Sequence, residues 1–117
     1  MEITYIEGTV RGPKGKEEQV RFLVDSGATY SLLLERVWKS VELEPLREHS
    51  FTLADGSMST RKVSECYMIL PQGKAHTPVI LGEANDRALL GVVTLKILGL
   101  VLDPFKRTLR PMRILLV

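Results

Sequence analysis

One short stretch of the chain brings an acid, a hydroxyl group and a glycine to the end of an apolar segment. Every second residue from Val20 to Val24 is apolar, which predicts a strand that enters a buried region. Asp25, Ser26 and Gly27 follow directly. A carboxylate in such a place costs free energy unless it is paired or used in chemistry, and glycine permits a turn that a side chain would block. The pattern is typical of a catalytic loop, although the same residue types are common in ordinary turns.

The other reactive side chains indicate no second kind of site. Cys66 is the only cysteine, which excludes an intrachain disulfide, and we expect it to be a small strand residue and not a nucleophile. His49 and His76 are far apart in the sequence and lack the spacing of metal ligands. We therefore expect neither a metal nor a cofactor.

The composition is that of one ordinary globular domain. A chain of 117 residues with 44% hydrophobic and 26% charged residues forms one core and not two, so we expect a single domain over residues 1–117. The net charge of +2 is too small to indicate a nucleic-acid partner. A basic group near the C-terminus is interpreted as a solvated surface; it consists of Lys106, Arg107, Arg110 and Arg113.

The ends and the apolar segments of the chain indicate no membrane contact. Residues 1–5 lack the basic region and the apolar run of a signal peptide. The most apolar segment, residues 88–102, is interrupted by Lys96 and is too short to span a bilayer. We expect a soluble cytoplasmic protein.

Alternating apolar residues and turn signals divide the chain into short strands. A strong turn signal is Ala-Asp-Gly-Ser at residues 54–57. Val92, Leu95 and Leu98 recur at helical spacing, and Gly99 stands where a helix would end. The expected strands cover residues 2–10, 18–24, 30–34, 48–53, 59–70, 75–81, 89–91, 100–102 and 108–109, and residues 35–41 allow a turn or two of helix. These elements predict an all-β, barrel-like domain with one good helix.

Three segments, in this order, resemble the retropepsin-like aspartic proteases, and in particular a small prokaryotic group of that clan. They are Leu23-Val24-Asp25-Ser26-Gly27-Ala28-Thr29, the hairpin that contains Ala54-Asp55-Gly56, and Leu89-Leu90-Gly91 before the helix. The resemblance covers nearly the whole chain. It implies an all-β, single-lobe retropepsin-like acid protease barrel with one short C-terminal helix, closed into a two-fold homodimer.

The resemblance also implies roles for individual residues, with Asp25 as the catalytic one. The residues expected to support its loop are Ser26, Gly27, Ala28 and Thr29, those of the flap are Ala54, Asp55 and Gly56, and those packed against the loop are Leu89, Leu90 and Gly91. Ser26, where threonine is commoner, would form a hydrogen bond to the partner subunit. The flap tip lacks the glycine-rich run of viral retropepsins, and the apolar residues 114–117 would lie at the dimer interface.

Aspartic proteases hydrolyse a peptide bond with two carboxylates that share one proton and activate one water. Only Asp25 stands in an Asp-Ser/Thr-Gly context, because Asp55 is in a turn, Asp86 in a polar loop and Asp103 directly before Pro104. The second carboxylate must then come from a second copy of the chain. The expected function is that of an aspartic endopeptidase that acts as a homodimer on an extended peptide or protein.

Two other hypotheses stay open. A non-catalytic peptide-binding or scaffolding dimer would use the same fold, since a fold does not fix a function. A monomeric β-domain with Asp25 in an ordinary turn is the third hypothesis. The intact Asp25-Ser26-Gly27 favours the enzyme, whereas the unusual flap tip is the feature that argues against assigning catalysis from the motif alone.

Overall fold

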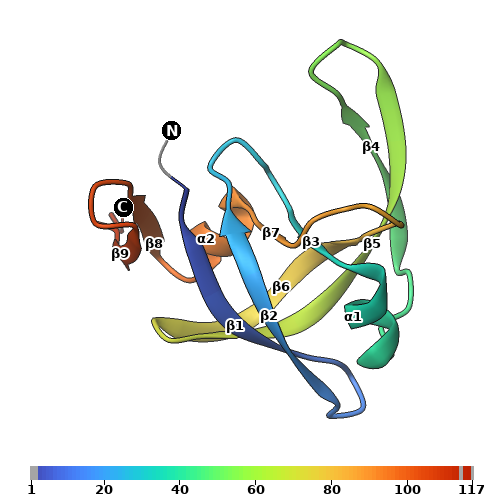
Figure 1. Ribbon diagram of the computed structural model, residues 1–117, viewed down its shortest axis with the longest axis horizontal. Coiled ribbons are helices and arrows are strands. Elements are labelled where there is room, and N and C mark those ends of the chain that lie inside the picture. The colour runs from blue at the N-terminus through green and yellow to red at the C-terminus, as the bar shows by residue number, and fades with distance from the viewer. Residues whose placement is uncertain (1–2, 114, 117) are drawn as a thin grey trace.

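The computed structural model describes residues 3–113 and 115–116. Seven strands form one curved sheet in the order β1-β2-β7-β3-β6-β5-β4, and β1 pairs with β5 as well as with β2 (Figure 1). The strands β8 and β9 form a separate two-stranded sheet. The elements are β1 (Tyr5–Arg11), β2 (Glu17–Val24), β3 (Ser31–Leu33), α1 (Glu35–Ser40), β4 (Arg47–Thr52), β5 (Met58–Leu70), β6 (Gly73–Leu81), β7 (Leu89–Leu90), α2 (Val92–Ile97), β8 (Leu100–Asp103) and β9 (Thr108–Pro111).

The strand that leads to Asp25 forms as its alternation predicts. In β2 the side chains of Val20, Phe22 and Val24 are buried in the core, and the residues between them are more exposed. Phe22 is fully buried, which stabilises the fold by roughly 1.5–3 kcal/mol. The two-residue strand β7 lies parallel to the end of β2, with Leu90 paired to Val24. The chain just after β2 is therefore held at the centre of the sheet.

Residues 3–113 form two short helices, where the sequence predicted one short C-terminal helix. The additional helix α1 forms because Val37 is fully buried in the core and Trp38 packs against the same core. Trp38 also donates its indole N–H to the carbonyl of Gly82 at 2.9 Å. The predicted helix is α2, which ends at Ile97 and is followed by Gly99 with a φ of 67°. Neither helix in the described part of the chain is long enough to cross a bilayer.

The strand β9 of the small second sheet is the last element that the structure describes. Pro111 is the last residue of β9 in the two-stranded sheet, so this proline does not interrupt a central strand. Leu115 and Leu116 are exposed in the single subunit. Ile114 and Val117 lie outside the described residues, so the role of residues 114–117 in a dimer stays a prediction.

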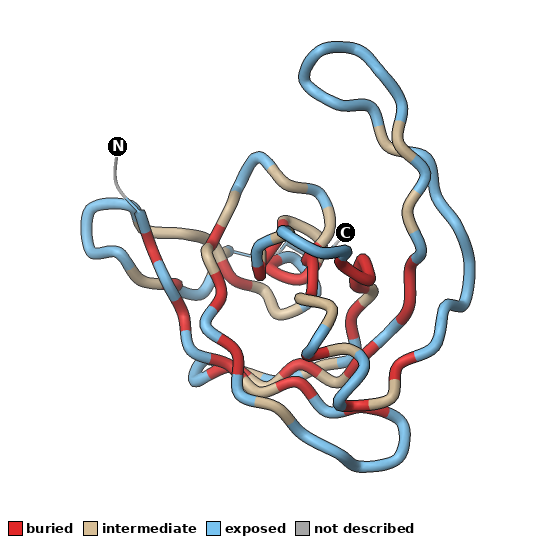
Figure 2. The backbone as a smooth tube through the Cα atoms, turned by 45° about the vertical axis from the view of Figure 1, so that its right-hand side comes forward, coloured by how far each residue is buried: buried red, intermediate tan, exposed pale blue. Residues whose placement is uncertain are grey.

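The hairpin of β4 and β5 extends beyond the rest of the sheet. Its tip bends toward the side of the molecule on which the loop between β2 and β3 lies (Figures 1 and 2). No residue of β4 is buried, and Figure 2 shows the outer half of the hairpin as almost entirely exposed. This hairpin is the predicted flap, and it is held to the body of the protein mainly at its base.

Candidate active site

Asp25 directly follows β2 and opens a loop that we call the active loop, residues 25–30. Its backbone N–H donates to the carbonyl of Leu90 at 3.1 Å. One carboxylate oxygen, Oδ1, accepts the backbone N–H of Gly27 at 2.9 Å, and the Asp25 carbonyl accepts the N–H of Ala28 at 3.1 Å. The other oxygen, Oδ2, has no partner among the described residues. The half-buried carboxylate is thus fixed in direction while one oxygen stays available.

A glycine is needed at position 27 for a different physical reason from the one that the sequence suggested. The φ of Gly27 lies outside the left-handed region, so the turn itself does not require a glycine. A Cβ at Gly27 would lie 3.2 Å from Oδ1 of Asp25. The absence of a side chain allows the carboxylate to approach the backbone N–H closely.

The start of α2 supports the second half of the active loop. The N–H groups of Val92 and Val93 donate to the carbonyls of Ala28 and Thr29, both at 2.9 Å. A Cβ at Gly91 would lie only 2.5 Å from the carbonyl carbon of Tyr30. Leu89, Leu90 and Gly91 therefore lie next to the active loop, and no larger residue fits at Gly91 without a shift of the backbone.

A buried network of hydroxyl groups lies beneath this contact. The hydroxyl of Ser31 is 2.6 Å from that of Thr94, which is 2.8 Å from that of Thr77. The Ser31 hydroxyl also accepts the N–H of Gly91 at 3.0 Å. All three hydroxyl residues are buried and join β3, α2 and β6. Sequence reasoning missed them, although a signal existed: each is a small hydroxyl residue inside an otherwise apolar segment.

Ser26 lies on the surface, with no hydrogen-bond partner among the described residues of its own subunit. It borders an open, largely apolar pocket of about 320 Å³. The other residues that line this pocket are Val92, Leu95, Lys96, Leu100, Val101, Leu102, Pro104 and Met112. Apolar surface therefore surrounds the exposed end of the active loop.

The predicted flap residues form the tip of the β4–β5 hairpin. The N–H of Leu53 donates to the carbonyl of Ser57 at 2.8 Å, and Gly56 has a φ of 87°, so Ala54, Asp55 and Gly56 make a compact turn. Oδ1 of Asp55 accepts both the hydroxyl and the backbone N–H of Ser57. These hydrogen bonds stabilise the carboxylate and lower the pKa of Asp55 from its ordinary value.

The flap contacts the active loop through a ring cluster that the sequence did not predict. The ring of Tyr30 lies 5.7 Å from that of Phe51 and 6.0 Å from that of His49, and these two rings lie 5.0 Å apart. Tyr30 ends the active loop, and His49 and Phe51 belong to β4. No short sequence signal links residues that are about twenty positions apart, so this cluster is visible only in the structure.

The two remaining aspartates serve local structure. Asp86 binds the guanidinium of Arg61 and accepts the N–H of Glu83 at 2.6 Å. Oδ1 of Asp103 accepts the N–H groups of Phe105 and Lys106 at 3.1 and 3.2 Å. Neither is brought together with Asp25 by any contact that the structure shows. Among residues 3–113 and 115–116, no three His, Cys, Asp or Glu side chains are grouped as metal ligands.

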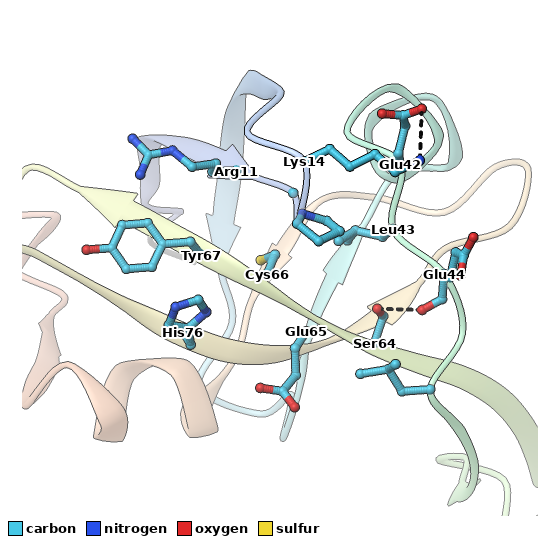
Figure 3. A pocket seen from close by; sticks show the side chains of 13 residues that line it. Arg11, Lys14, Glu42, Leu43, Glu44, Ser64, Glu65, Cys66, Tyr67 and His76 are labelled. Atoms are coloured by element: carbon cyan, nitrogen blue, oxygen red, sulfur yellow. Dashed lines mark hydrogen bonds and ion pairs between the residues drawn. The ribbon is translucent and has the colours of Figure 1, made fainter.

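A larger cavity, of about 600 Å³, lies apart from the active loop, and no residue of that loop lines it (Figure 3). Its lining includes Leu43, Cys66, Tyr67 and His76. Cys66 is buried in β5, and desolvation raises the pKa of its thiol to about 12. The thiol therefore stays protonated near neutral pH, and the position of Cys66 within β5 confirms that it is a strand residue.

Comparison with known proteins bears on this arrangement. No curated protein matches the chain. A family model described as "Aspartyl protease" matches residues 6–93, which include β2, the active loop, the flap and β7. The match covers more than half of the chain, and the protein therefore belongs to an aspartyl protease family of the retropepsin-like clan.

Proposed function

We propose that the protein is an aspartic endopeptidase that acts as a homodimer, with one Asp25 from each subunit in a shared active site. Membership of the aspartyl protease family supports a protease-like function. The observation that carries the finer proposal is the placement of the aspartates. Asp25 stands on a braced central loop, whereas Asp55, Asp86 and Asp103 each hold a separate turn or ion pair. A second carboxylate for the reaction then comes from a second copy of the chain.

In this dimer the two Asp25 carboxyl groups face each other across the two-fold axis and share one proton, because two close negative charges repel strongly. The ionised group takes a proton from a water molecule, whose oxygen adds to the carbonyl carbon of the scissile bond. The protonated group donates its proton to the carbonyl oxygen. The carboxyl group that took the proton from water then gives it to the amine nitrogen as the C–N bond breaks. The other carboxylate takes a proton from a hydroxyl of the tetrahedral intermediate, so that the carboxylic acid product forms and the pair again shares one proton. Chain atoms form no covalent bond with the substrate in this sequence.

Ser26 supports the dimeric arrangement. Its hydroxyl is exposed, has no hydrogen-bond partner among the described residues of its own subunit and borders apolar surface. In the proposed dimer this surface is covered, and Ser26 donates a hydrogen bond to the partner's active loop. A net contribution of roughly 1 kcal/mol for each such bond is typical.

The rival function is that of a non-catalytic peptide-binding dimer. The observation that favours it is the flap tip, which is a compact turn with one glycine and lacks a flexible glycine-rich run. Such a tip would clamp a peptide without needing to open widely. This rival predicts peptide binding that survives without any cleavage.

A digest of an unstructured protein and of a peptide library tests the proposal. We expect cleavage by the wild type, inhibition by pepstatin-like compounds, and no cleavage by Asp25→Asn. Binding of the same peptides by both proteins, with cleavage by neither, would support the rival function instead.

A further inference from the structure

The strand β5 is paired without interruption along only one of its edges. On that edge β6 pairs with every residue from Val63 to Leu70. On the opposite edge β1 pairs only with residues 67–69, and β4 pairs only with residues 58–63. Within the described part of the chain, residues 64–66 therefore have no strand beside them on this edge. We call this interruption the β5 gap.

The backbone of Glu65 faces the β5 gap. Residues of an antiparallel pair turn their N–H and C=O groups alternately toward the partner strand and away from it. Val63 turns its carbonyl away from β6, because this carbonyl accepts the N–H of Leu46 at 2.9 Å. Glu65 is two residues further along and lies opposite Pro78, which has no N–H to donate. The N–H and the C=O of Glu65 therefore both point into the gap.

Proline residues on both sides prevent the gap from closing as a strand pair. If the β1 register continued beyond Arg11, Pro13 would lie opposite Glu65. If the β4 register extended backwards from Arg47, Pro45 would lie there. Neither proline has a backbone N–H, and no backbone hydrogen bond joins Glu65 to either segment as the structure describes them. Glu65 thus keeps an unused donor and an unused acceptor.

The gap opens into the cavity of about 600 Å³ (Figure 3). Ser64, Glu65 and Cys66 line this cavity together with residues of both flanking segments. Its volume lies in the range of ligand-binding pockets. Leu43 and Cys66 are buried and provide an apolar floor, whereas Leu46 is exposed at the edge. The cavity therefore combines apolar surface with a free backbone donor and acceptor.

Two carboxylates at this cavity lack a cationic partner. The side chains of Glu44 and Glu65 line the cavity and form no ion pair with any described residue. The cationic side chains there already have partners: the guanidinium of Arg11 forms an ion pair with a glutamate of β2 at 2.6 Å, and the ammonium of Lys14 lies 3.8 Å from a carboxylate oxygen of Glu42. A cationic group on a ligand would complement the two free carboxylates.

We propose that the β5 gap and its cavity form a second peptide-binding site, which takes an extended segment of a partner protein. The segment lies in the gap as a short added strand and exchanges backbone hydrogen bonds with Glu65. Its side chains alternate between two faces. An apolar side chain covers Leu43 and Leu46 on the inner face, and a neighbouring Lys or Arg lies beside Glu65 on the outer face. The site is independent of the function proposed above, because no residue of the active loop lines the cavity.

Nuclear magnetic resonance of the Asp25→Asn protein tests the location of binding without cleavage of the peptide. The probe is the acetylated hexapeptide amide Thr-Val-Leu-Lys-Val-Thr. We expect the backbone amide resonance of Glu65 to shift as the peptide is added. A shift confined to the active loop, or no shift at Glu65 up to about 1 mM peptide, would overturn the proposal. A Glu65 resonance that depends on the concentration of the protein alone would also overturn it, because a second copy would then cover the gap.

Methylated peptides test the backbone contact. Two versions of the probe carry a methyl group on the backbone nitrogen of Leu or of Lys, and these two nitrogens face opposite edges of an extended strand. Only one of them can donate to the Glu65 carbonyl. We expect one methylated peptide to bind about threefold to tenfold more weakly than the other. Equal affinities of the two methylated peptides would overturn the strand addition.

A charge exchange tests the carboxylates. Replacement of the Lys in the probe by Glu should weaken binding by about threefold to tenfold. In the double variant Glu44→Gln/Glu65→Gln this difference should disappear. The control variant Glu7→Gln changes an exposed glutamate of β1 that does not line the cavity, and it should keep the full preference for Lys. A preference for Lys that survives in the double variant would overturn the assignment of the peptide to this cavity, whether or not the wild type is a protease.

Discussion

The active loop and the flap tip contain the same local motif in opposite surroundings. In both, an aspartate Oδ1 accepts the backbone N–H two residues later at 2.9 Å: Asp25 accepts from Gly27, and Asp55 from Ser57. Both turns also contain a glycine and a serine. The types of residue in the turn and the local hydrogen bond therefore do not distinguish a candidate catalytic aspartate from a structural one, whereas the residue order Asp-Ser-Gly occurs only at Asp25.

The difference lies in what surrounds each turn. The active loop donates a hydrogen bond to β7 and accepts two from the start of α2. The buried hydroxyl network lies beneath it. The backbone hydrogen bonds of the flap tip, by contrast, all stay within the hairpin. A braced loop holds a carboxylate in one direction, whereas an exposed hairpin with few contacts opens at low free-energy cost. Catalysis by the proposed mechanism needs both properties, one in each region.

Exchanging each aspartate for asparagine should give the largest contrast. Asp25→Asn should lower kcat by at least about 100-fold, because an amide neither accepts a proton from water nor shares one with a partner carboxylate. Asp55→Asn should retain most of the activity, since its side-chain oxygen still accepts the N–H of Ser57. Cleavage assays on both proteins decide this, and an active Asp25→Asn beside an inactive Asp55→Asn would reverse the site assignment.

Substitution of a glycine by alanine should cost more stability beside the active loop than at the flap tip. In Gly91→Ala the new Cβ would lie 2.5 Å from the carbonyl carbon of Tyr30, so the backbone must move, at a cost of roughly 3 kcal/mol and with a displaced active loop. In Gly56→Ala nothing lies within 4 Å of the new Cβ. Its φ of 87° costs only about 1–2 kcal/mol.

Urea denaturation together with cleavage assays checks this pair. Gly91→Ala should lose both stability and activity, whereas Gly56→Ala should mainly loosen the flap. Equal effects of the two substitutions would mean that the active loop is no more tightly packed than the flap.

Hydroxyl groups provide a third comparison. Thr94→Val removes the central hydroxyl of the buried network and leaves those of Ser31 and Thr77 without it, which should lower the free energy of unfolding by about 1–3 kcal/mol. Thr52→Val, on the exposed flap, should change it by less than about 0.5 kcal/mol. Thermal or urea unfolding measures both values. A stable Thr94→Val would show that the network contributes little to the bracing of the active loop.

The parts that the sequence predicted are those with local signals. Apolar residues at every second position located β2, and the glycines located the β4–β5 turn and the end of α2. The family resemblance predicted that Leu90 and Gly91 lie next to the active loop. A Cβ at Gly91 would collide with the backbone of Tyr30, which explains why a glycine is needed there.

The parts that escaped prediction depend on contacts between distant segments. Ser31, Thr77 and Thr94 meet only because β3, β6 and α2 converge beneath the loop. The Tyr30 cluster forms because the flap crosses the end of the active loop. Helix α1 was foreseen only as a turn or two, since six residues give little periodicity and its stability comes from the burial of Val37.

The smallest expected effect concerns the pH response of the flap tip. The hydrogen bonds from Ser57 lower the pKa of Asp55 below its ordinary value of 3.8. A lowered folded-state pKa means that the stabilising contribution is present above the unfolded value and is lost as the pH falls through the folded value. The turn should therefore loosen only in acid below about pH 3.8, while the neutral amide in Asp55→Asn does not titrate.

Hydrogen exchange at the backbone N–H of Ser57 measures this response, after correction for the intrinsic pH dependence of exchange. Protection in the wild type should decrease below the ordinary pKa of the carboxyl, and protection in Asp55→Asn should be independent of pH over the same range. The N–H of Val92, which donates to the Ala28 carbonyl at 2.9 Å in the braced region, serves as the internal reference. A parallel loss of protection at Ser57 and Val92 would indicate general acid unfolding. The flap would then not open independently of the active loop.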